Sequence, residues 1–166
     1  MTDLKSNSIL RLDHIPETAS ELSVAAQRLA RLLRGQISML LAANGDLGLV
    51  EWRICLCISQ SEKPSQKELV DFAGIEQAQV SRALMKLEQK GIIESKQSAR
   101  DRRVRIFALS EKGQAYFDRV QPVIEGYHQQ IDAVLSETEK AQFLDMVERV
   151  AKAAQLASND EAQQAG

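Results

Sequence analysis

The sequence predicts a mainly α-helical fold with one small β-hairpin, an α+β arrangement. Apolar residues recur at spacings of three and four along most of the 166 residues, which is the period of amphipathic helices. An alternating pattern rich in β-branched residues is confined to residues 92–109. Only 3 prolines and 8 glycines argue against a turn-rich all-β fold, and 44% hydrophobic residues suffice for a packed core.

The amino-terminal part of the chain is predicted to be a polar arm followed by one long helix. Residues 1–15 form the arm, which we expect to be flexible, and residues 16–48 contain the helix, which ends at Asn44-Gly45-Asp46. The apolar stripe of this helix is broad, and the helix is too long to be buried on a small domain alone. We therefore expect it to serve as a dimerisation helix that meets another subunit.

Residues 49–110 are predicted to form a lobe of three helices and a hairpin. A helix over about 49–60 is apolar nearly all round, which favours a central position. Ser65-Gln66-Lys67-Glu68 has the spacing of a capping box that opens a short helix, and Gly74 suits the left-handed residue that ends it. The next helix, over about 76–90, has one apolar face and one face of glutamine, arginine and lysine.

The hairpin is predicted from two alternating segments, 92–97 and 103–109, which flank a polar and basic tip. Helical spacing then resumes at once, and a second capping box, Ser136-Glu137-Thr138-Glu139, opens the last helix. We assign residues 111–158 to C-terminal dimerisation helices and residues 159–166 to a disordered tail.

The net charge of −2 hides a strongly basic segment. Residues 78–112 contain nine lysines and arginines against four acidic residues, a net charge of +5, so the rest of the chain carries −7. A local basic zone in an acidic protein is the electrostatic footprint expected for a polyanion. The other interpretation is an ordinary solvated basic face.

A capped short helix, a tight glycine turn, a second helix with a polar face and a basic hairpin follow one another in the order of a winged helix-turn-helix. In that fold the second helix enters the major groove of DNA, where glutamine and arginine can contact base edges. The hairpin, called the wing, reaches the adjacent backbone or minor groove. The sequence therefore predicts binding to double-stranded DNA. The alternative is a winged-helix module whose basic face binds a protein partner.

The segment from Ser65 through Gly113 resembles the MarR-type family of bacterial transcription regulators (multiple antibiotic resistance regulators), and the resemblance extends over about residues 17–157. It implies a homodimer that binds a pseudo-palindromic operator, most often as a repressor released by a small aromatic ligand. The motifs that carry the resemblance are Gln79-Val80-Ser81-Arg82, Leu87-Glu88-Gln89-Lys90-Gly91-Ile92-Ile93, Asp101-Arg102-Arg103 and Leu109-Ser110-Glu111-Lys112-Gly113.

The predicted DNA contacts lie on the two helices of the helix-turn-helix and on the wing. Lys86 is expected to touch phosphate, and the resemblance implies that Asp101 holds Arg103 by a salt bridge while Arg103 enters the minor groove. The full set of predicted DNA-binding residues is Ser65, Gln66, Gln77, Gln79, Ser81, Arg82, Lys86, Arg100, Asp101, Arg102 and Arg103.

A ligand cleft is predicted between the first, second and fifth helices, with a tryptophan for stacking, apolar side chains and arginines for an anion. This mixed chemistry favours a small aromatic acid or phenol as effector. A redox-sensing regulator acting through Cys55 or Cys57 is the alternative, against the simpler interpretation of two buried core thiols. The predicted ligand-binding residues are Arg31, Arg34, Met39, Leu40, Trp52 and Cys55.

Several classes of protein are not expected. The sequence has no nucleophile–base pair, phosphate loop or paired acid site, so we do not expect an enzyme. No Cys, His or Asp spacing matches a zinc site, and we expect neither a metal nor a cofactor. The longest run without a charge, Gly35 to Gly45, is short of the ~18 residues that a membrane span needs. Without an export leader, a cytoplasmic protein is expected.

Overall fold

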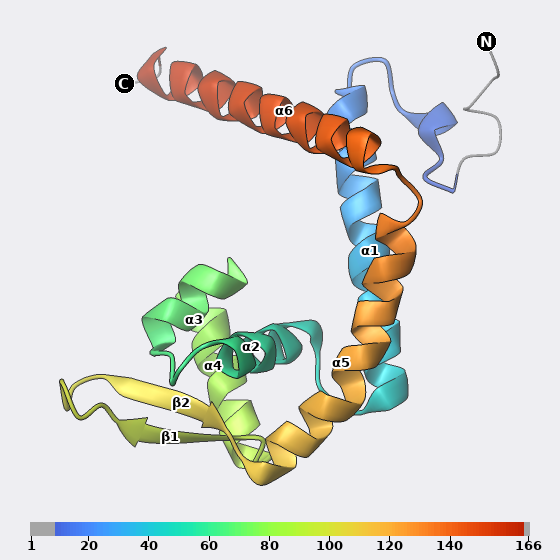
Figure 1. The fold of residues 1–166 in the computed structure, drawn as a ribbon. Coiled ribbons are helices and arrows are strands. Elements are labelled where there is room, and N and C mark those ends of the chain that lie inside the picture. The colour runs from blue at the N-terminus through green and yellow to red at the C-terminus, as the bar shows by residue number, and fades with distance from the viewer. Residues whose placement is uncertain (1–8, 165–166) are drawn as a thin grey trace. The chain divides into compact units, whose positions relative to one another are not determined.

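The computed structural model describes the backbone of residues 9–164 and the side chains of residues 9–156. Residues 1–8 of the predicted arm and residues 165–166 of the predicted tail lie outside the described residues. The fold is mainly helical with one two-stranded antiparallel sheet, which confirms the predicted class (Figure 1). The elements are η1 (Leu12–His14), α1 (Glu21–Asn44), α2 (Leu49–Gln60), α3 (Gln66–Ala73), α4 (Gln77–Gln89), β1 (Ile93–Gln97), β2 (Arg105–Leu109), α5 (Glu111–Asp132) and α6 (Glu137–Gln164).

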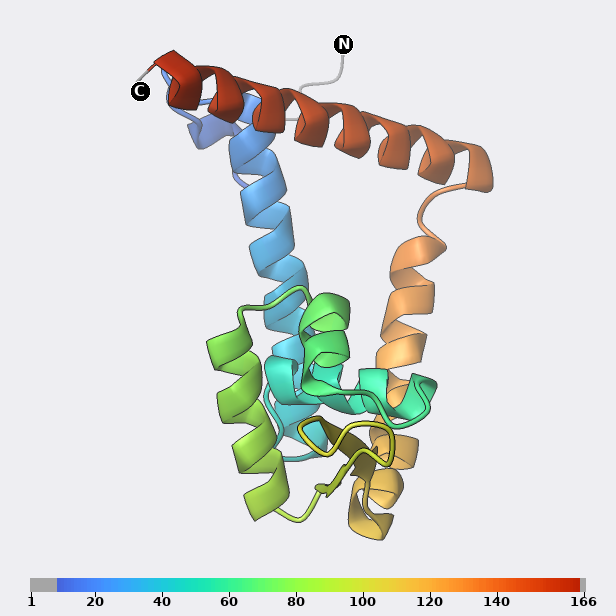
Figure 2. The same ribbon diagram turned by 90° about the vertical axis from the view of Figure 1, so that its left-hand side faces the viewer.

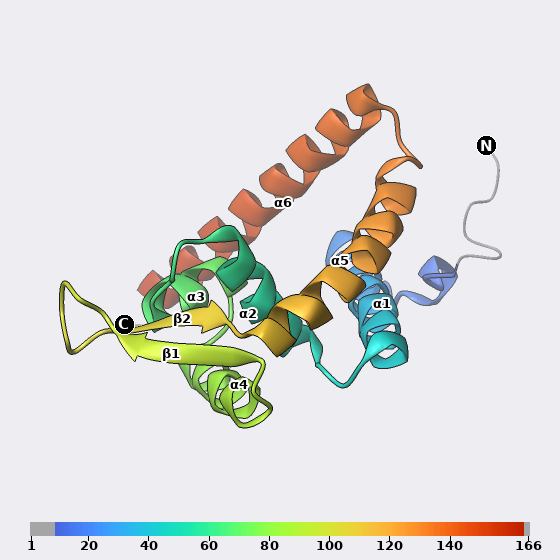
Figure 3. The same ribbon diagram turned by 60° about the horizontal axis from the view of Figure 1, so that its bottom comes forward.

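The chain comprises two compact units, and residues 32–125 form the larger one. In this unit α2 contacts α3, α4 and β2, so the helix that the sequence predicts to be central is central. The green helices α3 and α4 lie beside the turquoise helix α2 (Figure 2), and the hairpin extends away from them (Figure 3). Aliphatic side chains make up most of the core, and its fully buried side chains include Leu41, Ile54, Leu69, Val80, Leu87, Phe107 and Val120.

The helix-turn-helix follows from local sequence signals. The Ser65 hydroxyl accepts a hydrogen bond from the backbone N–H of Glu68 at 3.4 Å, and the Glu68 carboxylate accepts one from the N–H of Ser65 at 2.7 Å. These bonds complete the predicted capping box at the start of α3, and they lower the pKa of Glu68. Gly74 ends α3 with φ of 60°, a left-handed conformation that favours glycine, and α4 begins three residues later.

The wing is joined to α5 through the segment Leu109–Gly113. Leu109 pairs with Ile93 at the base of the hairpin. The Ser110 hydroxyl donates to the carbonyl of Gly91 at 2.6 Å and accepts from the N–H of Gly113 at 3.0 Å, so one side chain ties the end of α4 to the start of α5. A Cβ at position 113 would overlap with the carbonyl oxygen of Ile92, which explains the glycine.

The second unit combines residues 9–31 with residues 126–164. The Ser20 hydroxyl accepts a hydrogen bond from the N–H of Ser23 at the start of α1. Helix α1 begins at Glu21, within the range of residues 16–48 to which the sequence assigns it. The predicted capping box of Ser136 and Glu139 opens α6.

Helix α6 continues to Gln164, whereas the sequence predicts a disordered tail from residue 159. The residues that extend the helix include alanine, glutamate and glutamine, which are good helix formers, and no glycine or proline interrupts them. The predicted boundary at 158 therefore lies within α6.

Candidate nucleic-acid interface

Helix α4 separates its side chains onto two faces, as the sequence predicts. Val80, Ala83, Leu84 and Leu87 are buried against the rest of the unit. The opposite face carries the predicted base-contacting residues: Gln77, Gln79 and Arg82 are exposed, and Ser81 is half-buried. Amide and guanidinium groups on an exposed helix face can form paired hydrogen bonds with base edges in a major groove.

The tip of the wing presents four exposed charged residues in sequence: Arg100, Asp101, Arg102 and Arg103. Asp101 shapes the turn, because its carboxylate accepts a hydrogen bond from the backbone N–H of Arg103 at 2.9 Å and its carbonyl accepts one from Val104 at 3.0 Å. A short acidic side chain that bonds the backbone two residues ahead is a common turn device.

The salt bridge expected between Asp101 and Arg103 is not among the ion pairs of the described residues. The carboxylate of Asp101 instead bonds the main chain of Arg103. The link between these two residues therefore acts on the backbone of the turn, and the guanidinium of Arg103 projects from a turn that Asp101 stabilises.

Arg105, which pairs with Gln97 next to the tip of the hairpin, anchors the wing to α4, a role that sequence reasoning missed. Its guanidinium pairs with the carboxylate of Glu88 at 2.5 Å, and Ser95 donates to the same carboxylate oxygen at 2.6 Å. The guanidinium also lies 5.4 Å from the centroid of the Phe107 ring. These contacts join α4, β1 and β2, so they fix the position of the wing relative to the exposed face of α4.

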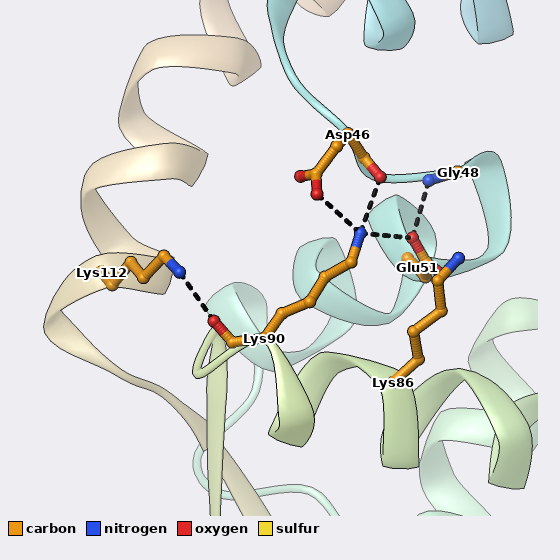
Figure 4. Close-up of polar contacts among 6 residues, drawn as sticks. All are labelled: Asp46, Gly48, Glu51, Lys86, Lys90 and Lys112. Carbon is orange, nitrogen blue, oxygen red and sulfur yellow. Dashed lines mark hydrogen bonds and ion pairs between the residues drawn. The ribbon is translucent and has the colours of Figure 1, made fainter.

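Lys86 has a partner within the chain, which the sequence did not suggest. Its ammonium lies 2.6 Å from a carboxylate oxygen of Glu51, whose side chain is only 7% exposed (Figure 4). The hydrogen bond with Glu51 raises the pKa of Lys86. Lys86, which is predicted to touch phosphate, therefore also neutralises a buried carboxylate of α2.

Glu51 belongs to a small ionic cluster that connects α2, α4 and the loop between α1 and α2. Its carboxylate accepts a hydrogen bond from the N–H of Gly48 at 2.8 Å, which helps to cap α2, and lies 4.0 Å from the ammonium of Lys90. Lys90 in turn pairs with Asp46 at 3.0 Å and donates to its carbonyl at 2.8 Å (Figure 4). Sequence reasoning missed Glu51, although the spacing Gly48-x-x-Glu51 carries half of a capping signal.

The remaining predicted DNA contacts, Ser65 and Gln66, lie at the start of α3 and are half-buried. The Ser65 hydroxyl donates to the Glu68 carboxylate and accepts from the Glu68 N–H, so this side chain caps α3. Two cavities flank the exposed face of α4. One of about 360 Å³ is lined by Gln66, Lys67, Val70 and Gln77, and one of about 410 Å³ is lined by residues that include Glu51, Gln79, Arg82 and Lys86.

The residues predicted to bind a ligand differ in exposure and lie in both compact units. Trp52 and Cys55 are buried in the core, where the indole stacks on Phe117 with ring centroids 5.1 Å apart. Met39 is 67% exposed, and Arg34 is exposed as well, while Leu40 is half-buried. Arg31 is exposed and belongs to the other compact unit. The cavities beside α4, and a third of about 370 Å³ whose lining includes Asp46, Lys90 and Tyr116, contain none of these six residues in their linings.

Both cysteines are free thiols in the core. Burial raises the pKa of Cys55 to about 12, and burial also raises that of Cys57. Redox-sensing thiols are accessible and have a lowered pKa, because the thiolate is the reactive form. These properties favour core thiols over the redox-sensing alternative.

Among the described residues, no cluster of three or more His, Cys, Asp or Glu could hold a metal ion. No helix of the part that the structure describes is both long and apolar enough to cross a lipid bilayer.

Comparisons with known proteins identify relatives of this chain. Residues 47–104 match the model of the MarR family. The chain is 28% identical over 109 residues, 64% of its length and 73% of the relative, to the HTH-type transcriptional regulator BilQ of Clostridium symbiosum (strain WAL-14163). The family match covers the helix-turn-helix, β1 and the tip of the wing, the segment in which the predicted DNA contacts lie.

Two solved structures from Streptomyces coelicolor have a similar fold. The MarR family transcriptional regulator Sco3205, in complex with DNA, matches with a TM-score of 0.69 at 19% identity, over 84% of this chain and 92% of that one. The PcaV transcriptional regulator, in complex with its natural ligand, matches with a TM-score of 0.65 at 21% identity, over 82% and 99%. All three relatives are named as transcriptional regulators, in agreement with the expectation of a regulator rather than an enzyme.

Proposed function

We propose that this chain, a MarR-type DNA-binding transcription regulator, acts as a homodimeric repressor that binds a pseudo-palindromic operator and is released by a small aromatic acid or phenol. The observation that carries the proposal is the exposed glutamine and arginine face of α4, next to a wing tip with three arginines in four residues. We assign DNA binding to residues 49–110, and dimerisation to residues 16–48 and 111–158. Because its target is DNA, we place the protein in the cytoplasm.

In the proposed complex α4 lies in a major groove. Gln77, Gln79, Ser81 and Arg82 are at its amino-terminal end, where recognition helices contact base edges. Arg103 enters the adjacent minor groove from the turn that Asp101 holds, since the narrow groove attracts arginine by its negative potential. The two other wing arginines, with Ser65 and Gln66, contact phosphates, and Lys86 contributes positive charge while it remains paired with Glu51.

The proposed homodimer is supported by the apolar surface of α6. Every residue of α6 from 141 to 156 is exposed, although apolar side chains recur at helical spacing along it. A soluble monomer rarely exposes so large an apolar stripe, and a second copy of the chain is the partner that a two-fold operator requires. The exposed apolar residues of α6 include Phe143, Leu144, Met146, Val147, Val150 and Leu156, and Leu22 of α1 is also exposed.

The proposal that an effector releases the DNA is supported by the similar fold of PcaV, which binds a natural ligand. A ligand can shift the position of the two recognition helices only if it binds one arrangement more tightly than the other. Such coupling between sites is typically worth about 1–3 kcal/mol.

In the deciding experiment, the purified chain is mixed with DNA fragments from the genome that encodes it, and the fragments that it retains are recovered. The affinity of the chain for one of these fragments is then measured at several salt concentrations. The proposal expects a palindromic fragment and a steep loss of affinity with salt, because Lys and Arg release counterions from DNA. Retention of no DNA sequence, together with a salt-independent complex with another protein, would favour the protein-interaction module instead.

A further inference from the structure

The exposed face of α4 has an apolar part that the predicted DNA contacts do not include. Ala78 is exposed, and Met85 is 51% exposed. Neither residue belongs to the hydrophobic core of the described residues, and neither lines any of the three cavities described above. Packing within the described part of the chain therefore leaves both side chains available to a partner of α4.

These two residues lie at the centre of the exposed face. Successive residues of an α-helix are about 100° apart around its axis, so four exposed residues of α4 fall within an arc of about 60°. The midpoint of this arc is about 180° from the midpoint of the four buried residues of the helix. The exposed set, which we call the outer stripe, therefore points directly away from the rest of the unit. It consists of Ala78, Arg82, Met85 and Gln89.

Two ion pairs fix the rotation of α4 about its axis. On one side of the outer stripe Glu88 pairs with Arg105 of β2 at 2.5 Å, and on the other side Lys86 pairs with Glu51 of α2 at 2.6 Å (Figure 4). Glu88 and Lys86 each lie about 70–90° around the helix from the middle of the outer stripe. Because α4 is held from both sides, the outer stripe keeps its outward direction when the helix enters a groove.

The outer stripe combines one charged, one amide and two apolar side chains. In a major groove, arginine and glutamine can form paired hydrogen bonds with guanine and adenine, whereas the C5-methyl group of thymine is contacted by apolar side chains. An alanine or methionine placed against a hydrogen-bonding group of another base would exclude water from that group without replacing its hydrogen bond. The two apolar residues of the outer stripe therefore favour thymine.

The spacing of the two apolar residues fits base pairs that lie close together. Ala78 and Met85 are seven residues apart, which is about 10.5 Å along the helix axis. This length corresponds to about three base-pair steps of ~3.4 Å when the helix follows the groove. Arg82 lies between the two. The short alanine side chain requires a close approach near the amino-terminal end of α4, whereas methionine is long and flexible and can reach a base from further along the helix.

We propose that Ala78 and Met85 are specificity-determining residues, which contact the C5-methyl groups of two thymines on the two sides of the base that Arg82 contacts. The inference rests on the proposed function, because it requires α4 to lie in a major groove. It adds two residues to the predicted DNA contacts. It also gives each operator half-site a preference for thymine at two positions about three base pairs apart.

The test uses the operator fragment that the chain retains, together with copies in which deoxyuridine replaces one thymidine of each half-site, position by position. Deoxyuridine keeps every hydrogen-bonding group of thymidine and lacks only the methyl group. Fluorescence anisotropy of the full chain, without effector, measures the affinity for each copy. Burial of one methyl-sized group corresponds to about fourfold in affinity, so we expect a loss of about fourfold per half-site at two positions.

Substitutions in the outer stripe assign the two positions. Met85→Gln keeps the length and helix propensity of the side chain but presents a polar amide, whereas Met85→Leu stays apolar. We expect Met85→Gln to lose its sensitivity to deoxyuridine at one position only and Met85→Leu to keep both losses. Ala78→Ser, which places a hydroxyl against the methyl group, should remove the loss at the other position. Met39→Ala, at an exposed methionine of α1, is the control and should keep both losses.

The inference is overturned if no deoxyuridine copy binds more weakly than the original fragment. It is also overturned for Met85 if Met85→Gln keeps both losses, and for Ala78 if Ala78→Ser does. Each of these results requires a bound operator, so each leaves the proposed function standing. A chain that retains no DNA would instead contradict the proposed function, and the inference with it.

Discussion

Replacement of Glu51 by glutamine tests whether the buried carboxylate holds the DNA-binding helix in place. The amide oxygen of glutamine can still accept the hydrogen bond from the N–H of Gly48, so the cap of α2 survives. What is lost is a charged hydrogen bond at 2.6 Å to Lys86 and the longer attraction to Lys90. Hydrogen bonds to charged groups contribute about 1.5–3 kcal/mol to stability.

Other contacts of the two lysines offset part of the free energy that Glu51→Gln loses. The side chain of Lys86 is 56% exposed and can return to water, and Lys90 keeps its contacts with Asp46. We therefore expect Glu51→Gln to lower the free energy of unfolding by about 1–2 kcal/mol, below the ~3–5 kcal/mol found when a fully buried pair loses one partner. Glu51→Ala also removes the cap of α2 and leaves a small void, so it should cost roughly 1 kcal/mol more.

Urea unfolding at a fixed protein concentration measures these differences. The fluorescence of Trp52, the single tryptophan of the chain, reports on α2 directly, because Trp52 is adjacent to Glu51 and stacks on Phe117. The cost of Glu51→Gln should persist at high salt, since buried pairs are screened less than exposed ones. Glu137→Gln, in an exposed pair with Lys140 on α6, is the control and should change little. Equal midpoints for the two glutamine variants would refute the assignment of a structural role to Glu51.

Three further predictions concern the wing, the dimer and the core thiols. Arg103→Ala should weaken operator binding by about 1–3 kcal/mol, and Asp101→Ala should act in the same direction by loosening the turn; unchanged fluorescence anisotropy titrations for both variants would remove the wing from DNA recognition. Val147→Glu together with Leu144→Glu, on the exposed stripe of α6, should give a folded monomer in sedimentation experiments, and a dimer that survives both changes would contradict the assigned interface. Cys55 has a folded-state pKa of about 12, raised from 9.0, so its unfolded thiol loses a proton first as the pH rises. Stability should therefore fall between pH 9 and 12, less so in Cys55→Ala, and an equal fall in both chains would contradict the burial argument.

The parts of the fold that were predictable from the sequence depend on signals between neighbouring residues. The capping box at Ser65, the left-handed glycine at position 74 and the alternation of the hairpin strands each specify local geometry within a few residues, and the structure confirms them. The apolar face of α4 follows from helical spacing alone, and the structure buries this face.

The parts that were not predictable depend on residues far apart in the chain. Glu51 is a single acidic residue in an apolar helix, and nothing near it in the sequence shows that Lys86 will lie 2.6 Å away. Helical spacing shows that Trp52 belongs to an apolar surface, but it does not show whether that surface faces a cleft or the core. In the structure the indole stacks on Phe117 in the core. The cavity beside Tyr116 likewise depends on the approach of three separate segments.

The junction between the wing and α5 has a consequence for how such a protein can be altered. Residues added near Asp101 would lengthen the tip, because the strand register from Ile93 to Leu109 is set at the other end of the hairpin. One residue added between Leu109 and Gly113 would instead displace Ser110 from the carbonyl of Gly91 and turn all of α5 by about 100° about its axis. Exchange of wing tips between related chains is therefore a route to new operator preferences, provided that the five residues 109–113 are transferred with α5 rather than with the wing.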